Sequence, residues 1–251
     1  MADELTADDV MDRTAVAVLE FGRGWMLDPT TIGRSAELGL DGPFGFWVNG
    51  RAGFLGDVDA DVASSAIGFM APAMVRHHWE TECGRTHADL TEEYAASAAA
   101  WGRNVLAGIP SGDLDRLTDL CDRIADAAVP STGTLFSGWR HVDRPDDPAG
   151  RATIALNVVR ELRGGAHLSA VHAVGLGPHG AIMSTDDPIR GGVAGSERFG
   201  WGEPHPEPDP AARIEAERLT SAACRPAYES LDPDERTDFV RLVTAARAAM
   251  D

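Results

Sequence analysis

The stretch RATIALNVVRELRGGAHLSAVHAV, residues 151–174, decides the fold. If it forms a helix, apolar side chains cover nearly its whole circumference, and such a helix belongs in the interior of a larger helical assembly. The apolar positions are Ile154, Ala155, Leu156, Val158, Val159, Leu162, Ala166, Leu168, Ala170 and Val171. We therefore expect a mostly α protein, a multi-helix bundle packed around this one helix.

Polar side chains interrupt the apolar helix along one face. Asn157, Arg160, Arg163 or Gly164, and His167 recur at intervals of three and four residues, which places them on the same side of a helix. Burying two guanidinium groups and an imidazole costs several kcal/mol unless each is paired. Their partner is either an anionic ligand, such as a carboxylate or phosphate, or a carboxylate from a neighbouring helix in a structural network.

Two adjacent glycines, Gly164 and Gly165, lie in the middle of the same helix. Each costs about 1 kcal/mol relative to alanine at such a position, so their presence favours the close approach of another backbone or of a ligand. We place the expected close approach at Gly164.

Caps, prolines and apolar spacing predict further helices on both sides of this one. They are expected at 7–21, 29–38, 57–80, 89–107, 114–128, from 210 onward and at 232–250. A helix, a proline-marked turn and an amphipathic helix occur at 89–128 and again at 210–250, so two tandem helical repeats are one interpretation. The halves would be residues 1–130 and 131–251, either as two units or as one compact domain.

Two segments depart from the helical pattern. In residues 43–55, PFGFWVNGRAGFL, the pair Asn49-Gly50 is typical of a hairpin turn and predicts a small β-ribbon. Residues 175–208 are rich in Gly and Pro and lack periodicity, which predicts a long loop. Loops of this length in compact domains are often lids, and Trp201 gives this one a side chain to bury.

The charge balance disfavours a nucleic-acid partner. All 22 basic residues are arginine and stand against 40 acidic residues, for a net charge of −18, which repels phosphate backbones. No stretch approaches the ~20 apolar residues of a membrane span, and residues 1–5 lack the features of a signal peptide. We expect a cytoplasmic protein with no membrane partner, and a homo-oligomer is compatible with this composition.

No pattern in the sequence identifies a metal or cofactor. His78 and Glu82 have a chelating spacing but no evident third ligand, and the three cysteines form no CxxC pair. Nucleophile elbows, phosphate-cradling loops and dinucleotide fingerprints are absent, so the cofactor and any catalytic residues stay unknown. His172 lies at the start of the long loop, where it could close over a ligand.

The run from Arg160 to His167, RELRGGAH, resembles the LRExRGxxH signature of an actinobacterial family described only as helix-turn-helix, with no known function. Residues 50–56, residues 69–75 and Gly200-Trp201 also fit that family. The resemblance covers about 45–240 and implies that Arg51, Arg163, Gly164 and His167 are positions of interest. It implies no reaction.

The chain departs from this family in two places. Residues 20–23, Glu-Phe-Gly-Arg, replace a Glu-Pro-x-His pattern in the first helix, so Arg23 stands where the family has a histidine. The stretch after Trp201 is short and proline-rich where the family resembles a winged-helix segment. These departures argue against a metal or catalytic role for the first helix and against groove reading by a wing.

Three functions are compatible with these observations. The first is a small-molecule-binding protein with a buried Arg/His-lined pocket for an anionic or aromatic metabolite, formed by Arg51, Asn157, Arg160, Arg163, Gly164, His167, His172 and Trp201. The second is an enzyme that uses His167 with Arg160 and Arg163 for acid–base or anion-stabilising chemistry. The third is a helix-turn-helix transcriptional regulator, which the net charge disfavours.

Overall fold

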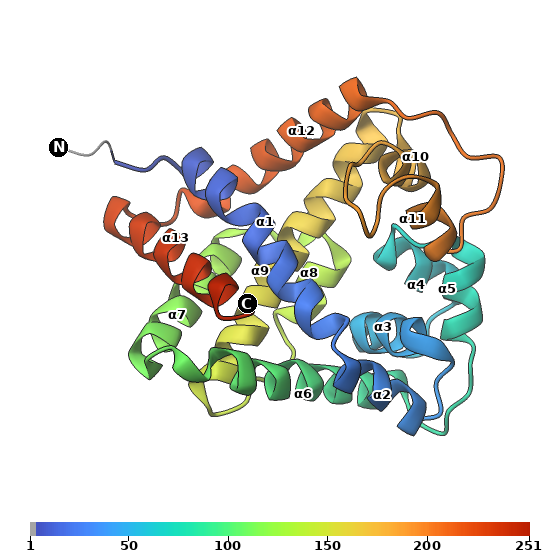
Figure 1. Ribbon diagram of the computed structural model, residues 1–251, viewed down its shortest axis with the longest axis horizontal. Coiled ribbons are helices and arrows are strands. Elements are labelled where there is room, and N and C mark those ends of the chain that lie inside the picture. Colours follow the sequence, from blue (N-terminus) through green and yellow to red (C-terminus); the bar gives the residue numbers. More distant parts are fainter. Residues whose placement is uncertain (1–3) are drawn as a thin grey trace.

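The structure is a computed structural model that describes residues 4–251, and within them it is all-helical, with no strand (Figure 1). The first half contains α1 (Ala7–Met26), α2 (Pro29–Glu37), α3 (Gly42–Ala52), η1 (Gly53–Leu55), α4 (Ala60–Ile67), α5 (Pro72–Trp79), α6 (His87–Val105), η2 (Leu106–Gly108) and α7 (Ser111–Ala127). The second contains η3 (Pro130–Thr132), α8 (Thr134–Trp139), α9 (Pro148–Ala173), α10 (Gly177–Met183), α11 (Gly192–Arg198), α12 (Pro210–Tyr228) and α13 (Pro233–Ala248). The prediction of a mostly α, multi-helix fold is confirmed.

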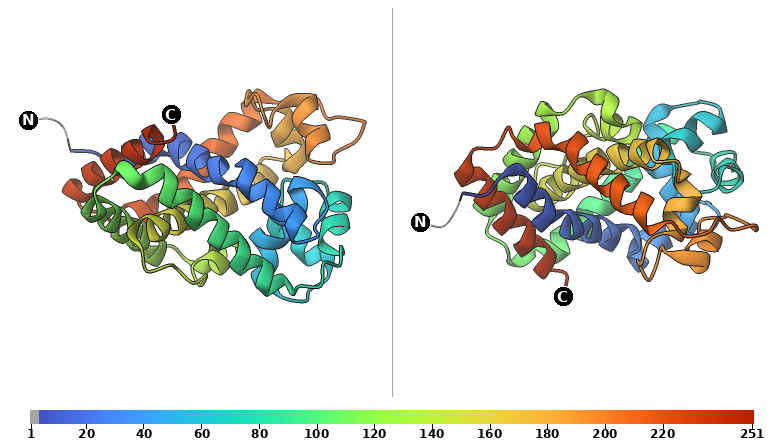
Figure 2. Two further views of the ribbon diagram at one scale, coloured as in Figure 1. Left: turned by 60° about the horizontal axis from the view of Figure 1, so that its bottom comes forward. Right: turned by 90° about the horizontal axis from the view of Figure 1, so that it is seen from above.

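Helix α9 runs through the middle of the molecule (Figures 1 and 2). The side chain of Asp147 caps it by accepting a hydrogen bond from the N–H of Gly150, and Pro148 occupies its first turn. Helices α1, α6, α7, α8 and α12 all pack against it. Its buried residues lie on every side of the helix, as its apolar circumference predicts.

One large core surrounds α9. Its centre is aromatic: the rings of Trp25 and Tyr94 lie 4.6 Å apart, and Trp139 is 6.4 Å from Trp25. Buried residues from both predicted halves contribute to this core, and α1 packs along α13 (Figure 2). A division of the chain at residue 130 stays a prediction. In the part of the chain described here, no helix combines the length and apolar character needed to cross a bilayer.

The predicted β-ribbon at 43–55 is wrong, because these residues form α3 and η1. Asn49 is buried within α3, and its amide donates hydrogen bonds to the carbonyl oxygens of Gly45 and His78. Gly50 is needed for contact between helices: a Cβ there would lie 2.4 Å from Cβ of Tyr94. The Asn-Gly pair therefore serves helix packing and forms no turn.

The structure does not support tandem repeats. In the first pair, α6 and α7 both pack on α9, whereas in the second pair α12 packs on α9 and α13 packs on α1 and α7. The two helix pairs, α6–α7 and α12–α13, therefore pack against different partners in the fold. Local cap signals recur wherever a helix begins and carry no information on the partner of that helix.

Residues 175–208 contain two short helices, α10 and α11, where the sequence predicts a long loop. They lie beside α4, α5 and the end of α9 (Figure 1). Three contacts attach this segment to α5 and the turn before it. Nε1 of Trp201 donates to the carbonyl of Phe69 at 3.0 Å, the N–H of Ala71 donates to the carbonyl of Phe199 at 2.8 Å, and Gly200 packs on Met74.

Candidate functional site

Glu161 of α9 is a buried carboxylate held by two arginines. Its side chain is 1% exposed and accepts two hydrogen bonds from the guanidinium of Arg51 on α3, at 2.8 and 2.7 Å. Nη1 of Arg160 donates to it at 2.7 Å. Burial raises the pKa of Glu161, but the charges of Arg51 and Arg160 outweigh it, so the pKa is lowered and the carboxylate is ionised. Glu161 is offset from the predicted polar face of α9, yet the long arginine side chains reach it.

Arg160 runs from α9 across the surface of α1. A Cβ at Gly22 would lie 2.3 Å from Cδ of Arg160, so only glycine leaves room for this path. Burial lowers the pKa of Arg160 to about 10, and its Nε has no hydrogen-bond partner among the described residues. The guanidinium remains charged at neutral pH, and its buried Nε–H is left without an acceptor among the described residues.

A second carboxylate, Glu217 of α12, pairs with two more arginines. Nη2 of Arg163 on α9 and Nη2 of Arg213 on α12 both lie in ion-pair contact with it. Arg213 and Glu217 are four residues apart on one helix face, so α12 presents this pair to α9 as a unit.

His167 sits between these groups as a neutral imidazole. Arg213 donates to its Nε2 at 2.8 Å, and because a guanidinium only donates, Nε2 is the acceptor. Nδ1–H therefore donates to Oγ1 of Thr220 at 2.9 Å, and that hydroxyl donates to the carbonyl of Ala216. The ring of Phe69 is stacked 5.7 Å away. Burial lowers the pKa of His167 to about 4, which keeps it uncharged at pH 7.

A third carboxylate, Asp187, lies in the segment before α11. It accepts hydrogen bonds from Arg190 at 3.0 and 3.1 Å and from Nη2 of Arg23 on α1 at 3.0 Å. Burial raises the pKa of Asp187, but the N–H of Ile189 and the charge of Arg190 outweigh it and lower the pKa to about 2. Arg23 thus links α1 to the segment 175–208.

These groups form one arginine cluster with an excess of positive charge. It comprises Arg23, Arg51, Arg160, Arg163, Arg190 and Arg213 with the carboxylates Glu161, Asp187 and Glu217. Arg190 is central: its charge affects the pKa of Arg160 and of His167, and burial lowers its own pKa. Six guanidinium groups face three carboxylates, in a chain whose net charge is −18.

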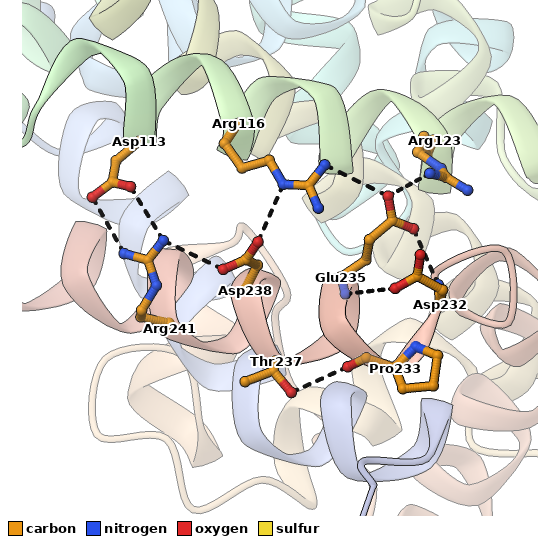
Figure 3. A network of polar contacts seen from close by, with 9 residues as sticks. All are labelled: Asp113, Arg116, Arg123, Asp232, Pro233, Glu235, Thr237, Asp238 and Arg241. Atoms are coloured by element: carbon orange, nitrogen blue, oxygen red, sulfur yellow. Dashed lines mark hydrogen bonds and ion pairs between the residues drawn. The ribbon is translucent and has the colours of Figure 1, made fainter.

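A second ion-pair network, between α7 and α13, shows the contrast (Figure 3). Its ion pairs join Arg116, Arg123 and Arg241 to Asp113, Glu235 and Asp238. Three arginines here pair with three carboxylates, and Figure 3 also draws Asp232, which is hydrogen-bonded to Glu235, so this network has no excess of positive charge. The arginine cluster does not have this balance, so its composition fits an anion that is not part of the chain.

The other predicted site residues differ in whether they contact residues of the arginine cluster. Asn157 lies one turn before Arg160 on α9, is 1% exposed, and neither of its amide atoms has a hydrogen-bond partner in the described part of the chain. Trp201 stacks on His179 and bonds to the carbonyl of Phe69, whose ring stacks on His167. His172 is exposed on the last turn of α9 and is not brought into these contacts.

The close approach falls at Gly165, one residue beyond the predicted position. A Cβ at Gly165 would lie 2.6 Å from Cα of Gly133 and 2.7 Å from the carbonyl oxygen of Thr132. A Cβ at Gly164 would meet only a carboxylate oxygen of Glu161, at 3.7 Å. Gly165 therefore packs α9 against the start of α8, and Gly164 leaves open space above Glu161.

Three of the six arginines, Arg23, Arg190 and Arg213, were not predicted as site residues from the sequence. Arg213 and Glu217 carry a usable signal, since opposite charges four residues apart on a predicted helix indicate a paired face. Arg23 was noted only as a departure from the family pattern. Asp187 and Arg190 lie in a segment without periodicity, where no spacing rule predicts contact with α9.

A shallow surface hollow lined by Glu20, Arg23, Gly24, Leu27 and Met250 opens beside the cluster. The segment 175–208 contributes Asp187 and Arg190 to the cluster.

Comparisons with known proteins give one match. No curated protein and no solved structure is significantly similar to the chain. The profile of a family described as the Helix-turn-helix family matches residues 13–207, which is most of the chain and includes all of α9 and much of the arginine cluster. The chain therefore belongs to this helix-turn-helix family.

Proposed function

We propose that the protein binds a small anionic metabolite at the arginine cluster. The observation that carries the proposal is the excess of six guanidinium groups over three carboxylates, in a cluster that is buried at Arg51, Arg160 and Glu161 and half-buried at the other arginines. An uncompensated buried charge is strongly destabilising, whereas a carboxylate or phosphate would supply the missing negative charge and the hydrogen-bond acceptors.

Unused donors in the cluster support this proposal. Nε of Arg160 and Nε of Arg23 are buried without hydrogen-bond partners among the described residues. A buried donor left unpaired costs about 1–3 kcal/mol, more when it is charged. Both arginines already contact a carboxylate through their terminal nitrogens, and in the proposed complex their unused Nε–H groups would also donate to the bound anion.

The segment 175–208 serves in this proposal as the cover of the site. It contributes Asp187 and Arg190 to the cluster, and its attachments to the rest of the chain include Arg23 and the turn at Phe69. An anion that displaces Asp187 from Arg23 or Arg190 would take over the same guanidinium donors. Binding and movement of this segment are thereby coupled.

The state of His167 favours binding over acid–base catalysis. Both ring nitrogens are engaged, one by Arg213 and one by Thr220, and a pKa of about 4 makes the imidazole a weak base at pH 7. In this arrangement His167 orients Arg213 toward the site. An enzyme that used His167 for proton transfer would first have to break one of these hydrogen bonds.

Membership of a helix-turn-helix family favours a second candidate, a transcriptional regulator. Helices α4 and α5, joined by a tight turn at Gly68, have the form of a helix–turn–helix pair. The region from residue 57 to residue 82 nevertheless exposes five carboxylates, Asp57, Asp59, Asp61, Glu80 and Glu82, against one arginine, Arg76. This face repels a phosphate backbone, so we rank regulation second. Binding of duplex DNA at 0.15 M salt (roughly physiological ionic strength) would reverse the ranking.

Mass spectrometry of small molecules that co-purify with the full chain tests the first candidate. We expect wild type to carry an anionic compound that Arg190→Gln loses and that the control Arg247→Gln keeps, since Arg247 pairs at the surface with Glu20 and Asp251. The same compounds at the same occupancy in all three proteins would contradict the proposal. If wild type carries none, the protein is titrated with inorganic phosphate, and absence of binding then contradicts the proposal.

A further inference from the structure

Four buried side chains beside the arginine cluster carry polar atoms that have no hydrogen-bond partner within residues 4–251. They are Nε1 of Trp25, Oη of Tyr94, both amide atoms of Asn157 and Nε of Arg160, and we call them the unpaired group. Trp25 is 0% exposed, and Tyr94 and Asn157 are each 1% exposed. Most buried polar atoms in folded proteins are paired, so four such side chains in one region call for an explanation.

The unpaired group lies where α1, α6 and α9 meet. The rings of Trp25 and Tyr94 are 4.6 Å apart, and Arg160 passes over Gly22, one turn before Trp25 on α1. Asn157 precedes Arg160 by one turn of α9. The charge of Arg160 also affects the pKa of Tyr94, which burial raises.

A matched residue shows that the fold satisfies a buried asparagine where its role is structural. Asn49 of α3 is also 1% exposed, yet its amide donates to two carbonyl oxygens, those of Gly45 and His78, at 2.9 and 2.8 Å. The amide of Asn157 makes no such hydrogen bond to any described residue. The difference points to a partner for Asn157 that comes from outside the chain.

The chemistry of the unpaired atoms defines that partner. The indole Nε1 of Trp25 and the Nε of Arg160 only donate, and the hydroxyl of Tyr94 and the amide of Asn157 can each donate as well. Three of the four side chains are uncharged, and four of the five unpaired atoms can donate whereas only Oδ1 of Asn157 is restricted to accepting, so the main complement is a neutral oxygen acceptor such as a carbonyl. A second full negative charge would find only Arg160 to balance it here.

Arg160 belongs to both sites: its Nη1 contacts Glu161 in the cluster and its Nε belongs to the unpaired group. One ligand that uses both must therefore carry its neutral acceptor next to its anionic group. We propose that the metabolite bound at the arginine cluster is a 2-oxo acid, whose carboxylate lies among the arginines and whose oxo oxygen accepts hydrogen bonds from the unpaired group. This inference rests on the proposed function.

Calorimetric titration of the full chain with matched acids tests the inference. The pairs are 2-oxobutanoate with butanoate and phenylpyruvate with 3-phenylpropanoate, because the members of each pair differ only in the oxo group. Hydrogen bonds that pair otherwise unsatisfied donors give an expected preference of about 10-fold or more for the oxo acid in at least one pair. We expect Asn157→Leu to reduce this preference to within about threefold while it leaves the affinity for the simple acid unchanged. Asn49→Leu is the control and should keep the preference.

The possible outcomes separate the two proposals. Equal affinity for both members of each pair, or a preference that survives in Asn157→Leu, overturns the 2-oxo acid inference and leaves anion binding intact. The same holds if inorganic phosphate binds and none of the four acids does. If neither the acids nor phosphate bind, both proposals fail. Should Asn157→Leu not fold, Tyr94→Phe, which removes one hydroxyl, has to lower the preference for the inference to stand.

Discussion

Glu161 is the carboxylate that makes the burial of Arg51 and Arg160 tolerable. Its replacement by glutamine leaves two guanidinium groups buried beside a neutral amide, and breaking a buried ion pair typically costs about 3–5 kcal/mol. We therefore expect Glu161→Gln to lower the free energy of unfolding, measured with urea, by an amount in that range. Glu215→Gln, which breaks an exposed pair with Arg218, is the control and should leave the free energy of unfolding close to that of wild type.

Replacing the two buried asparagines by leucine should have opposite effects on the free energy of unfolding. Asn157→Leu removes an amide without partners, so we expect the unliganded protein to unfold at an equal or higher urea concentration. Asn49→Leu removes two hydrogen bonds and should lower the free energy of unfolding by roughly 1–3 kcal/mol. Equal destabilisation by the two substitutions would mean that Asn157 is paired in solution.

Because the pKa of His167 is lowered in the folded protein, we expect the free energy of unfolding to fall in mild acid. Its pKa is about 4 in the folded protein and about 6.5 in an unfolded chain, so between these values the unfolded state binds more protons. The contribution of neutral His167 is therefore complete above pH 6.5 and disappears as the pH falls toward 4, by roughly 3 kcal/mol. Urea unfolding at pH 7 and pH 4.5 should show a smaller decline for His167→Gln than for wild type. Identical declines would refute the assignment.

At the scale of single residues, the sequence predicted which side chains share one face of α9 better than it predicted which residues form ion pairs. Helical spacing correctly places Asn157, Arg160 and His167 along α9, because the period of a helix depends on the backbone alone. The partner of Arg160 was harder to predict, since an arginine side chain is long enough to reach around the helix to Glu161. Contacts such as the one between Arg23 and Asp187 join residues far apart in the chain and have no local signature.

At the scale of elements, the paired glycines of α9 give a matched test. Gly165→Ala places a methyl group against the backbone at Gly133, where nothing flexible can move aside, so α9 must shift from the start of α8. We expect a loss of about 1–3 kcal/mol in the free energy of unfolding, measured with urea. Gly164→Ala meets no backbone and should stabilise the helix by up to about 1 kcal/mol. The reverse order of the two variants would contradict the packing described here.

Helix positions could be predicted from the sequence wherever caps and prolines mark them. Asp232, Pro233 and Glu235 form the predicted cap of α13, and Asp28 with Pro29 begins α2. The prediction for residues 43–55 was wrong because the pair Asn49-Gly50 is typical of a hairpin turn, and the tertiary contacts that favour a helix here are not visible in the sequence. The contact of Gly50 with Tyr94 belongs to tertiary structure, and sequence periodicity does not contain it.

At the scale of the whole molecule, the excess acidic charge and the arginine cluster have opposite signs. A net charge of −18 slows the approach of anions from a distance, so recognition depends on the fixed donors once a ligand is inside. Such a molecule suits a small anion held in a closed site better than a polyanion spread over a surface. Family membership and fold leave the ligand open, because function depends on the site and not on the arrangement of helices.

The most direct test of anion binding at the arginine cluster is the melting temperature of wild type and Arg190→Gln as a function of inorganic phosphate. Ionic strength is held constant with sodium chloride, so that general screening does not change. A ligand that binds only the folded state stabilises it by an amount that grows with the logarithm of its concentration, about 2.7 kcal/mol at 100 times Kd. We predict a continuing rise for wild type and little or none for Arg190→Gln. Parallel curves for the two proteins, or no rise in either, would contradict the account.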